Sequence, residues 1–172
     1  FLNYVRSGRY DNTFFHRLVS GFVPQGGGFS LKDPLPAENV TPKFDSVVTD
    51  PAIVNEFSSS RSNIARTVAM AKLGSSPNSA TSQFFFNLVD NSSNLDNQNG
   101  GFTVFGKVIG GWNVVTTIAA FTVRNLNTYL AGSQNAFDSV PISGSNNSDV
   151  VNIIDAEVIK RKNQTAFFLD NG

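Results

Sequence analysis

The 172 residues balance 13 Lys plus Arg against 13 Asp plus Glu, and this neutral composition argues against a protein that binds nucleic acid or an anionic membrane through its overall charge. The sequence contains no Cys and a single His, which excludes disulfides, thiolate catalysis and metal sites built from several Cys or His ligands. Hydrophobic residues make up 40% of the chain and 16 residues are Phe, a composition that favours one β-rich domain with an aromatic core.

The N-terminal residues predict a helix followed by two short strands. The apolar residues of 1–8 fall on one helical face, and the glycine that ends this stretch is a suitable C-terminal cap. Apolar runs at 12–19 and 22–25 predict strands, the second of which must place Pro24 at an edge or a bulge. The three glycines that follow at 26–28 predict a turn.

The middle of the chain predicts a long loop and then two strands. Residues 29–62 carry four prolines among polar residues and predict a loop, with a short ordered piece at 53–57. Residues 67–72 and 82–89 predict strands, and the three consecutive Phe inside the second are typical of a buried one. The polar stretches that follow these strands predict loops, which is where binding residues concentrate.

The C-terminal part predicts a strand, a helix and a closing strand. Residues 102–109 predict the first strand, and residues 112–121 predict a helix because Trp, Val and Ile recur there at helical spacing. Residues 122–149 are mostly polar and predict an irregular segment. Residues 150–159 predict the last strand.

Few residues could carry standard catalytic chemistry. A Ser-His-Asp triad would have to include His16, whose neighbours are aromatic and basic, so the favoured interpretation is a histidine packed inside a strand. The glycines at 26–28 lack the strand–GxGxxG–helix context of a nucleotide-binding loop. Arg17 is unusual because it lies in an apolar run, where a buried guanidinium needs partners; the alternative is an edge-strand arginine whose head reaches water.

Arg17 lies in the first of a series of short motifs that together indicate a function. The pattern Phe-His-Arg-x4-Phe-x2-Gln-Gly-Gly occupies residues 15–27, and it is followed by Val-Ala-Met-Ala at 68–71, Ser-Gln-Phe-Phe at 82–85, Leu-Asp at 95–96 and Phe-Thr-Val-Phe-Gly-Lys-Val at 102–108. Each motif alone is a weak signal, but the ordered series is specific. It resembles the cyclophilin family of peptidyl-prolyl cis/trans isomerases, and the segment 51–57 is similar to bacterial members in particular.

The resemblance implies a mostly β fold: a closed antiparallel barrel of eight strands capped by two α-helices. It covers residues 1 to about 120 and again 150–159, and we expect one isomerase domain over residues 1–160 with a C-terminal tail over 161–172. Family members have two strands before the first helix, and this sequence begins at that helix. We therefore expect either that the domain is N-terminally truncated, which would expose a strand edge, or that another chain supplies the two strands.

The resemblance also implies the site residues. Arg17 matches the catalytic arginine, and Gln25 matches the glutamine that orients both the substrate backbone and the arginine. The expected catalytic residues are Arg17, Gln25 and Phe85, of which Phe85 also forms a wall of the proline pocket. The expected substrate-binding residues are Phe22, Val23 and Leu95 in the pocket wall, Ala71, Lys72 and Gln83 in the groove before the proline, and Phe102 at the pocket rim.

The implied function is isomerisation of X–Pro bonds in proline-containing polypeptides. The resemblance implies that this activity needs no metal or cofactor, and that the protein neither binds nucleic acid nor inserts into a membrane. Asn94 stands where many members have a rim Trp, so we expect weak binding of cyclosporin-type ligands. Two alternatives remain open: a non-catalytic proline-peptide-binding module, and a scaffold that associates through residues 122–149 and the tail. A low Lys content with Ser- and Asn-rich loops favours an exported or periplasmic protein over a cytoplasmic one.

Overall fold

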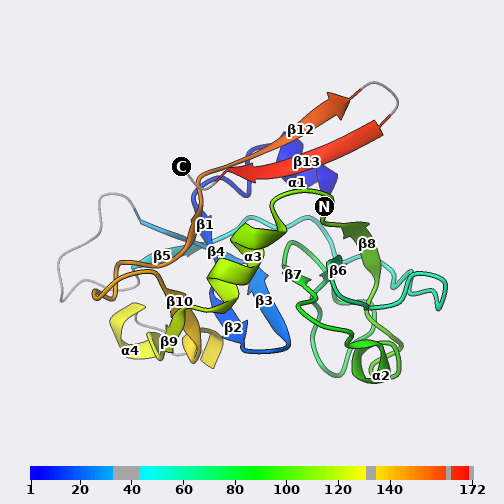
Figure 1. Ribbon diagram of the computed structural model, residues 1–172, viewed down its shortest axis with the longest axis horizontal. Coiled ribbons are helices and arrows are strands. Elements are labelled where there is room, and N and C mark those ends of the chain that lie inside the picture. Colours follow the sequence, from blue (N-terminus) through cyan, green and yellow to red (C-terminus); the bar gives the residue numbers. More distant parts are fainter. Residues whose placement is uncertain (33–42, 131–134, 162–163, 171–172) are drawn as a thin grey trace.

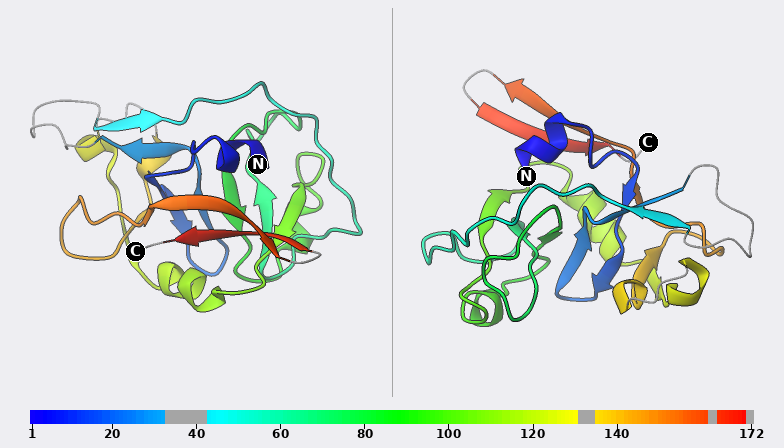
Figure 2. Two further views of the ribbon diagram at one scale, coloured as in Figure 1. Left: turned by 90° about the horizontal axis from the view of Figure 1, so that it is seen from above. Right: turned by 180° about the vertical axis from the view of Figure 1, so that it is seen from behind.

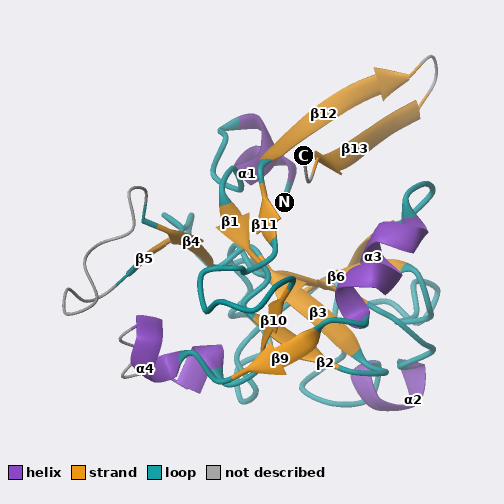
Figure 3. Cartoon of the chain, turned by 60° about the vertical axis from the view of Figure 1, so that its left-hand side comes forward, coloured by secondary structure: helices purple, strands orange, loops and turns teal. Residues whose placement is uncertain are grey.

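The computed structural model describes residues 1–32, 43–130, 135–161 and 164–170. This part of the chain is mostly β and contains four α-helices and one short 3-10 helix. They are α1 (Leu2–Arg6), α2 (Ser92–Leu95), α3 (Trp112–Ala119), α4 (Asn127–Leu130) and η1 (Asn135–Phe137). Figures 1 and 3 show α2 and α4 at opposite ends of the molecule. None of the described helices is long and apolar enough to cross a membrane.

The larger sheet has five antiparallel strands in the order β2-β3-β7-β6-β8. Their bounds are β2 Arg17–Val19, β3 Val23–Gly26, β7 Phe84–Phe86, β6 Thr67–Met70 and β8 Val104–Lys107. The predicted strands around Phe84–Phe86, Thr67–Met70 and Val104–Lys107 are confirmed. Pro24 lies opposite Leu18 in the β2–β3 pair, and the pairing of β3 with β7 begins only at Gln25, so the proline stands where β3 is paired on one side only.

The second sheet has four strands in the order β11-β1-β4-β5. Their bounds are β11 Asn152–Ile153, β1 Thr13–Phe14, β4 Phe29–Leu31 and β5 Phe44–Ser46. The run 12–19, predicted as one strand, is divided between the two sheets. The backbone N–H of Phe15 donates to the Val151 carbonyl, and that of His16 donates to the Gln25 carbonyl, so the chain changes ladder partner between these two residues.

Two predictions of irregular structure are wrong. The predicted loop at 29–62 contains β4 and β5, which pair with each other; residues 33–42 lie outside the described part. The predicted irregular segment 122–149 contains α4, η1 and a hairpin of β9 (Thr122–Arg124) with β10 (Val140–Ile142). Its apolar residues pack against Phe14 and Phe29 of the second sheet. We call this cluster the second core, which comprises Phe14, Phe29, Leu126, Leu130, Phe137, Val140, Ile142 and Val150.

The described strands do not form the closed eight-stranded barrel that the resemblance implies. β2 and β8 are the edges of the five-stranded sheet, β11 and β5 are the edges of the four-stranded sheet, and no ladder joins these sheets within the described residues. The chain beyond β11 continues as β12 (Asp155–Arg161), which pairs with β13 (Gln164–Asp170) instead of extending either sheet. Figures 1 and 2 show this hairpin as an arm beside α1. The expectation of two strands before Phe1 stays a prediction.

The main core lies between the five-stranded sheet and the helices α1 and α3. Helix α3 confirms the predicted helical stretch, and it buries Val115 and Ile118 against Phe84 and Phe86 of β7 and Tyr10. The face pointing inward follows the i, i+3 spacing seen in the sequence. This packing fixes β7, the central strand of the sheet, from one side.

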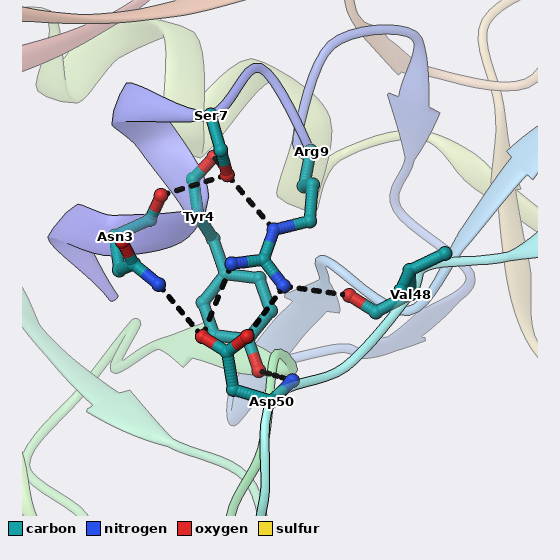
Figure 4. A network of polar contacts seen from close by, with 6 residues as sticks. All are labelled: Asn3, Tyr4, Ser7, Arg9, Val48 and Asp50. Atoms are coloured by element: carbon teal, nitrogen blue, oxygen red, sulfur yellow. Dashed lines mark hydrogen bonds and ion pairs between the residues drawn. The ribbon is translucent and has the colours of Figure 1, made fainter.

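A polar network fastens α1 to the segment that leads to residue 50 (Figure 4). The Arg9 guanidinium forms a bidentate pair with Asp50, with N–O distances of 2.8 and 3.1 Å, and it lies 4.2 Å from the centre of the Tyr4 ring. Asn3 donates to the same carboxylate, and the Tyr4 hydroxyl accepts from the Asp50 backbone N–H. The hydrogen bonds from Arg9 and Asn3 hold the pKa of Asp50 below its ordinary value. This partly exposed network joins α1 and the residues after it to Asp50, and none of its members belongs to the five-stranded sheet.

Candidate functional site

The register of the five-stranded sheet brings the three predicted catalytic residues into one row. Arg17 of β2 pairs with Gln25 of β3, and Gln25 pairs with Phe85 of β7. Residues directly opposite each other in a ladder point to the same face of the sheet, so these side chains are neighbours although 68 positions separate the first from the last in the printed sequence. The row continues to Ala69 of β6 and Val104 of β8.

The apolar side of this row is a cluster that we call the site cluster. Its buried members are Val23, Ala69, Phe85, Leu95 and Val104, and its partly buried members are Phe22, Ala71 and Phe102. All six apolar residues predicted for the site belong to it. The rings of Phe85 and Phe102 meet edge to face, with centroids 5.8 Å apart. Because three members retain exposed surface, the cluster can offer apolar contact to a ligand at its outer side.

The Arg17 side chain is exposed at the edge of this row. Within the described residues its guanidinium forms no hydrogen bond or ion pair, so its donors remain available to a ligand. Of the two interpretations made from the sequence, the structure shows the second: Arg17 is an edge-strand arginine that reaches water, not a buried guanidinium held by partners. Its strand pairs with β3, which carries Gln25 and contributes Val23 to the apolar cluster.

Two glutamines form the polar border of the site cluster. The Gln25 amide donates to the Gln83 side-chain oxygen at 2.8 Å, and the Gln83 carbonyl accepts from the Ala71 backbone N–H at 2.9 Å. Gly28 leaves room for this arrangement, because a Cβ at that position would lie 2.9 Å from the Gln83 side-chain nitrogen. The glycines predicted as a turn therefore also have a packing role: Gly26 ends β3, and Gly27 adopts a φ of +77° against Phe84.

His16 is buried beneath this border, with 2% of its surface exposed, which fits the predicted packed histidine. Its ring meets Phe29 edge to face at 5.0 Å. Burial lowers the pKa of His16 to about 4; the interaction with Gln83 opposes this shift and the positive charge of Arg17 adds to it. The imidazole is therefore neutral at pH 7 and does not add a second charge beside Arg17.

Lys72 differs from the other predicted residues, because its ammonium group is hydrogen-bonded to the backbone of the loop before Phe102. It donates to the carbonyls of Asn99 and Gly101 at 2.8 and 2.6 Å, and it lies 4.8 Å from the centre of the Phe102 ring. Desolvation lowers the pKa of Lys72. The ammonium group of Lys72 thus holds the loop that leads to the rim residue Phe102.

Sequence reasoning missed some residues of this region. Ala69 and Val104 belong to the site cluster, and both lie inside the sequence motifs at 68–71 and 102–108, where they had no predicted role. A cavity of about 430 Å³ lies elsewhere, between α3 and the segment 150–154, and shares no lining residue with the site cluster. Among the described residues, no group of three or more His, Asp or Glu could hold a metal ion.

The chain was compared with protein families and with known proteins. The family model described as "Cyclophilin type peptidyl-prolyl cis-trans isomerase/CLD" matches residues 1–144. The chain is 38% identical to peptidyl-prolyl cis-trans isomerase A of Dickeya dadantii over 131 residues, which is 75% of this chain and 62% of that protein. It is 40% identical to peptidyl-prolyl cis-trans isomerase cyp18 of Streptomyces antibioticus over 146 residues, covering 83% of this chain and 76% of that one.

A solved structure agrees with the sequence relatives. The crystal structure of a Cryptosporidium parvum cyclophilin type peptidyl-prolyl cis-trans isomerase in the presence of the dipeptide Ala-Pro superposes with a TM-score of 0.54 at 27% identity. The match covers 72% of this chain and 71% of that chain. The chain thus spans less than two thirds of the Dickeya relative and about seven tenths of the solved one.

Proposed function

The chain belongs to the cyclophilin-type family of peptidyl-prolyl cis-trans isomerases, and from that premise we propose that it accelerates rotation about X–Pro bonds of polypeptides at the site cluster. The observation that carries the proposal is the cross-strand row of Arg17, Gln25 and Phe85, which sets an unpaired guanidinium beside an apolar cluster. The solved relative was crystallised in the presence of Ala-Pro, which supports a proline-containing substrate.

The reaction requires no proton transfer and no covalent intermediate. Amide resonance gives the X–Pro bond a rotation barrier of roughly 20 kcal/mol, so uncatalysed interconversion takes tens to hundreds of seconds. When the bond is twisted, the lone pair of the proline nitrogen is no longer delocalised and becomes a hydrogen-bond acceptor. A donor aimed at that nitrogen stabilises the twisted state more than either planar state, which is the condition for catalysis.

The residues of the row suit these requirements. The Arg17 guanidinium is always charged and offers several donors in a planar fork, and it is the proposed donor to the proline nitrogen. Phe22, Phe85 and Phe102 would hold the proline ring by apolar contact while the preceding carbonyl rotates. Gln25, whose amide is oriented by Gln83, would bind the substrate backbone next to Arg17. Ala71, whose N–H already donates to Gln83, and Lys72 would line the path of the residues before the proline.

The test is to separate turnover from binding in Arg17 variants. We expect Arg17→Ala to lower kcat/KM for a proline-containing tetrapeptide by about 2–4 kcal/mol, roughly 30- to 1000-fold, because one preorganised donor is lost. Peptide affinity, measured by NMR titration, should change far less, since the apolar wall remains. Arg17→Lys should recover only part of the rate, because an ammonium group lacks the planar fork.

Arg6→Ala is the matched control, because Arg6 is an exposed arginine on α1, away from the row. It should leave both turnover and affinity unchanged. Near-normal turnover in Arg17→Ala would refute the role of Arg17. Binding of the peptide without any turnover in the unmodified chain would favour the non-catalytic proline-peptide module.

Three further expectations accompany this proposal. Asn94 is exposed on α2 and cannot supply the aromatic rim surface of a Trp, so cyclosporin-type ligands should bind weakly. The balanced charge argues against nucleic-acid partners held by phosphate contacts. Secretion into the periplasm or beyond is favoured over a cytoplasmic location by composition alone and would be tested by fractionation of the native host.

A further inference from the structure

A chain of buried amide side chains lies behind the site cluster. Asn63 and Asn87 have no exposed surface, and Asn91 is 5% exposed. Asn63 precedes β6, Asn87 directly follows β7, and Asn91 is the N-cap residue of α2. We call these three residues the amide chain. Buried amides lower stability unless they are hydrogen-bonded, so their partners show what they hold in place.

Each amide of the chain donates both of its hydrogens, which fixes the orientation of every member. Asn91 donates to the Asn87 side-chain oxygen at 2.8 Å, and Asn87 donates to the Asn63 side-chain oxygen at 3.1 Å. The second hydrogen of Asn87 reaches the Thr67 hydroxyl at 2.8 Å. Asn63 in turn donates to the Asp96 carboxylate at 2.8 Å. The direction of donation therefore runs from Asn91 to a charged acceptor.

The two ends of the amide chain hold walls of the site cluster. The remaining hydrogen of Asn91 reaches the Phe22 carbonyl at 3.1 Å, and the remaining hydrogen of Asn63 reaches the Phe102 carbonyl at 2.9 Å. Phe22 and Phe102 are far apart in sequence, and neither lies in a regular strand or helix. The amide chain is therefore a direct hydrogen-bonded link between these two walls.

The third wall residue is fixed by the same elements. The Leu95 backbone N–H donates to the Asn91 carbonyl at 2.8 Å, and the Phe102 N–H donates to the Leu95 carbonyl at 2.9 Å. Asp96, the next residue, also accepts from the Asn63 backbone N–H at 3.0 Å and from the Ser62 hydroxyl. Displacement of one amide would therefore shift the positions of Phe22, Leu95 and Phe102 together.

We infer that Asn63, Asn87 and Asn91 are positioning residues that set the spacing of the apolar walls, and thereby the size of the imino-acid ring that the site accepts. This inference rests on the proposed function. It assigns no contact with substrate to the amides; they act through the backbone of Phe22 and Phe102. Cooperative hydrogen-bonded networks of this kind fix one geometry when every member is satisfied.

The test compares two peptides that differ by one ring methylene, proline and its six-membered homologue pipecolic acid. An apolar site discriminates one methylene by about tenfold or more. In Asn87→Leu, which has a similar volume but no amide, we expect the preference for proline, taken as the ratio of kcat/KM values, to fall at least ~threefold. Asn91→Ala, which breaks the link to the Phe22 carbonyl, is the second variant if Asn87→Leu does not fold, and the same fall is expected.

Val140→Ala is the control for stability, because Val140 is fully buried in the second core and touches no member of the amide chain. It should lower Tm and leave the ratio unchanged. An unchanged ratio in the folded amide variants would overturn the inference while the proposed function stands. The ratio of peptide dissociation constants, measured by NMR titration, tests the same spacing independently of turnover, so a chain without isomerase activity would refute the proposed function alone.

Discussion

The site cluster and the second core are both built around Phe, but their polar surroundings differ. In the second core, the Phe137 ring lies 4.8, 4.9 and 5.9 Å from the rings of Phe44, Phe29 and Phe14, and Phe137 has no exposed surface. In the site cluster, the rings of Phe85 and Phe102 meet at 5.8 Å, and Phe102 keeps exposed surface.

The difference shows what separates a core from a site. Both clusters gain stability from burial of aromatic surface. Each cluster also has an arginine in its strand ladders: Arg17 lies opposite Gln25, and Arg124 lies opposite Val140 of the second core. The Arg124 guanidinium donates to the Ser145 carbonyl and the Asn147 side chain, whereas that of Arg17 has no hydrogen bond within the described residues. Abundant Phe in the sequence thus indicates a core, whereas an arginine with free donors beside partly exposed aromatic side chains indicates which part of the apolar surface can meet a substrate.

The largest expected effect compares one Phe from each region. Phe137→Ala and Phe85→Ala should each reduce the free energy of unfolding by about 3–5 kcal/mol, because each removes a buried aromatic side chain. Denaturant unfolding measures this loss. Turnover per folded molecule should stay unchanged in Phe137→Ala and fall at least ~tenfold in Phe85→Ala, which loses a wall of the proline site. An equal loss of turnover in both variants would remove the distinction between the two regions.

A smaller effect is expected from His16, which lies between the regions and touches both Phe29 and Gln83. The folded pKa of about 4 is below the ordinary value of 6.5, so between these values the unfolded chain binds a proton that the folded chain does not. The contribution of His16 to the free energy of unfolding is therefore complete above pH ~6.5 and is lost as the pH falls towards ~4. The slope is about 1.4 kcal/mol per pH unit, and the total loss is roughly 3 kcal/mol.

The measurement is denaturant unfolding at pH 6.5 and 5.5, a window in which most carboxylates remain ionised. The unmodified chain should lose about 1 kcal/mol across this window, and His16→Gln should lose much less. A wild-type chain as insensitive to pH as His16→Gln would show that the histidine is not held neutral by burial.

The smallest expected effect concerns the polar border of the site cluster. Gly28→Ala places a Cβ 2.9 Å from the Gln83 side-chain nitrogen, so the amide must move and its hydrogen bond with Gln25 weakens. We expect kcat/KM to fall about three- to tenfold, equivalent to one hydrogen bond of roughly 1 kcal/mol. Stability should change by less than ~1 kcal/mol, because the flexible end of Gln83 can give way.

Gly110→Ala is the control for this glycine, because no atom lies within 4 Å of a Cβ at that position. It should leave turnover unchanged. If Gly28→Ala turned over substrate as fast as Gly110→Ala, the position of Gln83 would have no influence on the reaction.

The elements with strong local patterns could be predicted from the sequence. The Phe run of β7, the strands β6 and β8, and helix α3 followed from apolar runs and helical spacing. The segment 122–149 could not be predicted in this way, because its apolar residues are sparse: Leu126 and Leu130 are one helical turn apart, and mostly polar or small residues, including Gly132, separate them from Phe137. Their partners Phe14 and Phe29 are more than ninety positions earlier in the printed sequence, so only tertiary packing orders this segment.

The candidate site was predictable to a different extent. The ordered motifs identified Arg17, Gln25 and Phe85, and the structure brings them into one row; their catalytic roles stay predictions. The amide chain was missed because Asn63 and Asn91 lie in polar stretches that predict solvated loops. The closed barrel was expected from resemblance alone, and strand pairing among the described residues differs from it, because β12 takes β13 as its partner.

The central claim is that the site cluster accelerates rotation about an X–Pro bond. Two-dimensional NMR exchange spectroscopy on a proline-containing peptide tests it directly, since uncatalysed exchange over tens of seconds gives no cross-peaks between the cis and trans signals. Substoichiometric amounts of this chain should produce those cross-peaks, and the same amount of Arg17→Ala should produce far weaker ones. Cross-peaks of equal intensity with both proteins, or none with the unmodified chain, would contradict the account.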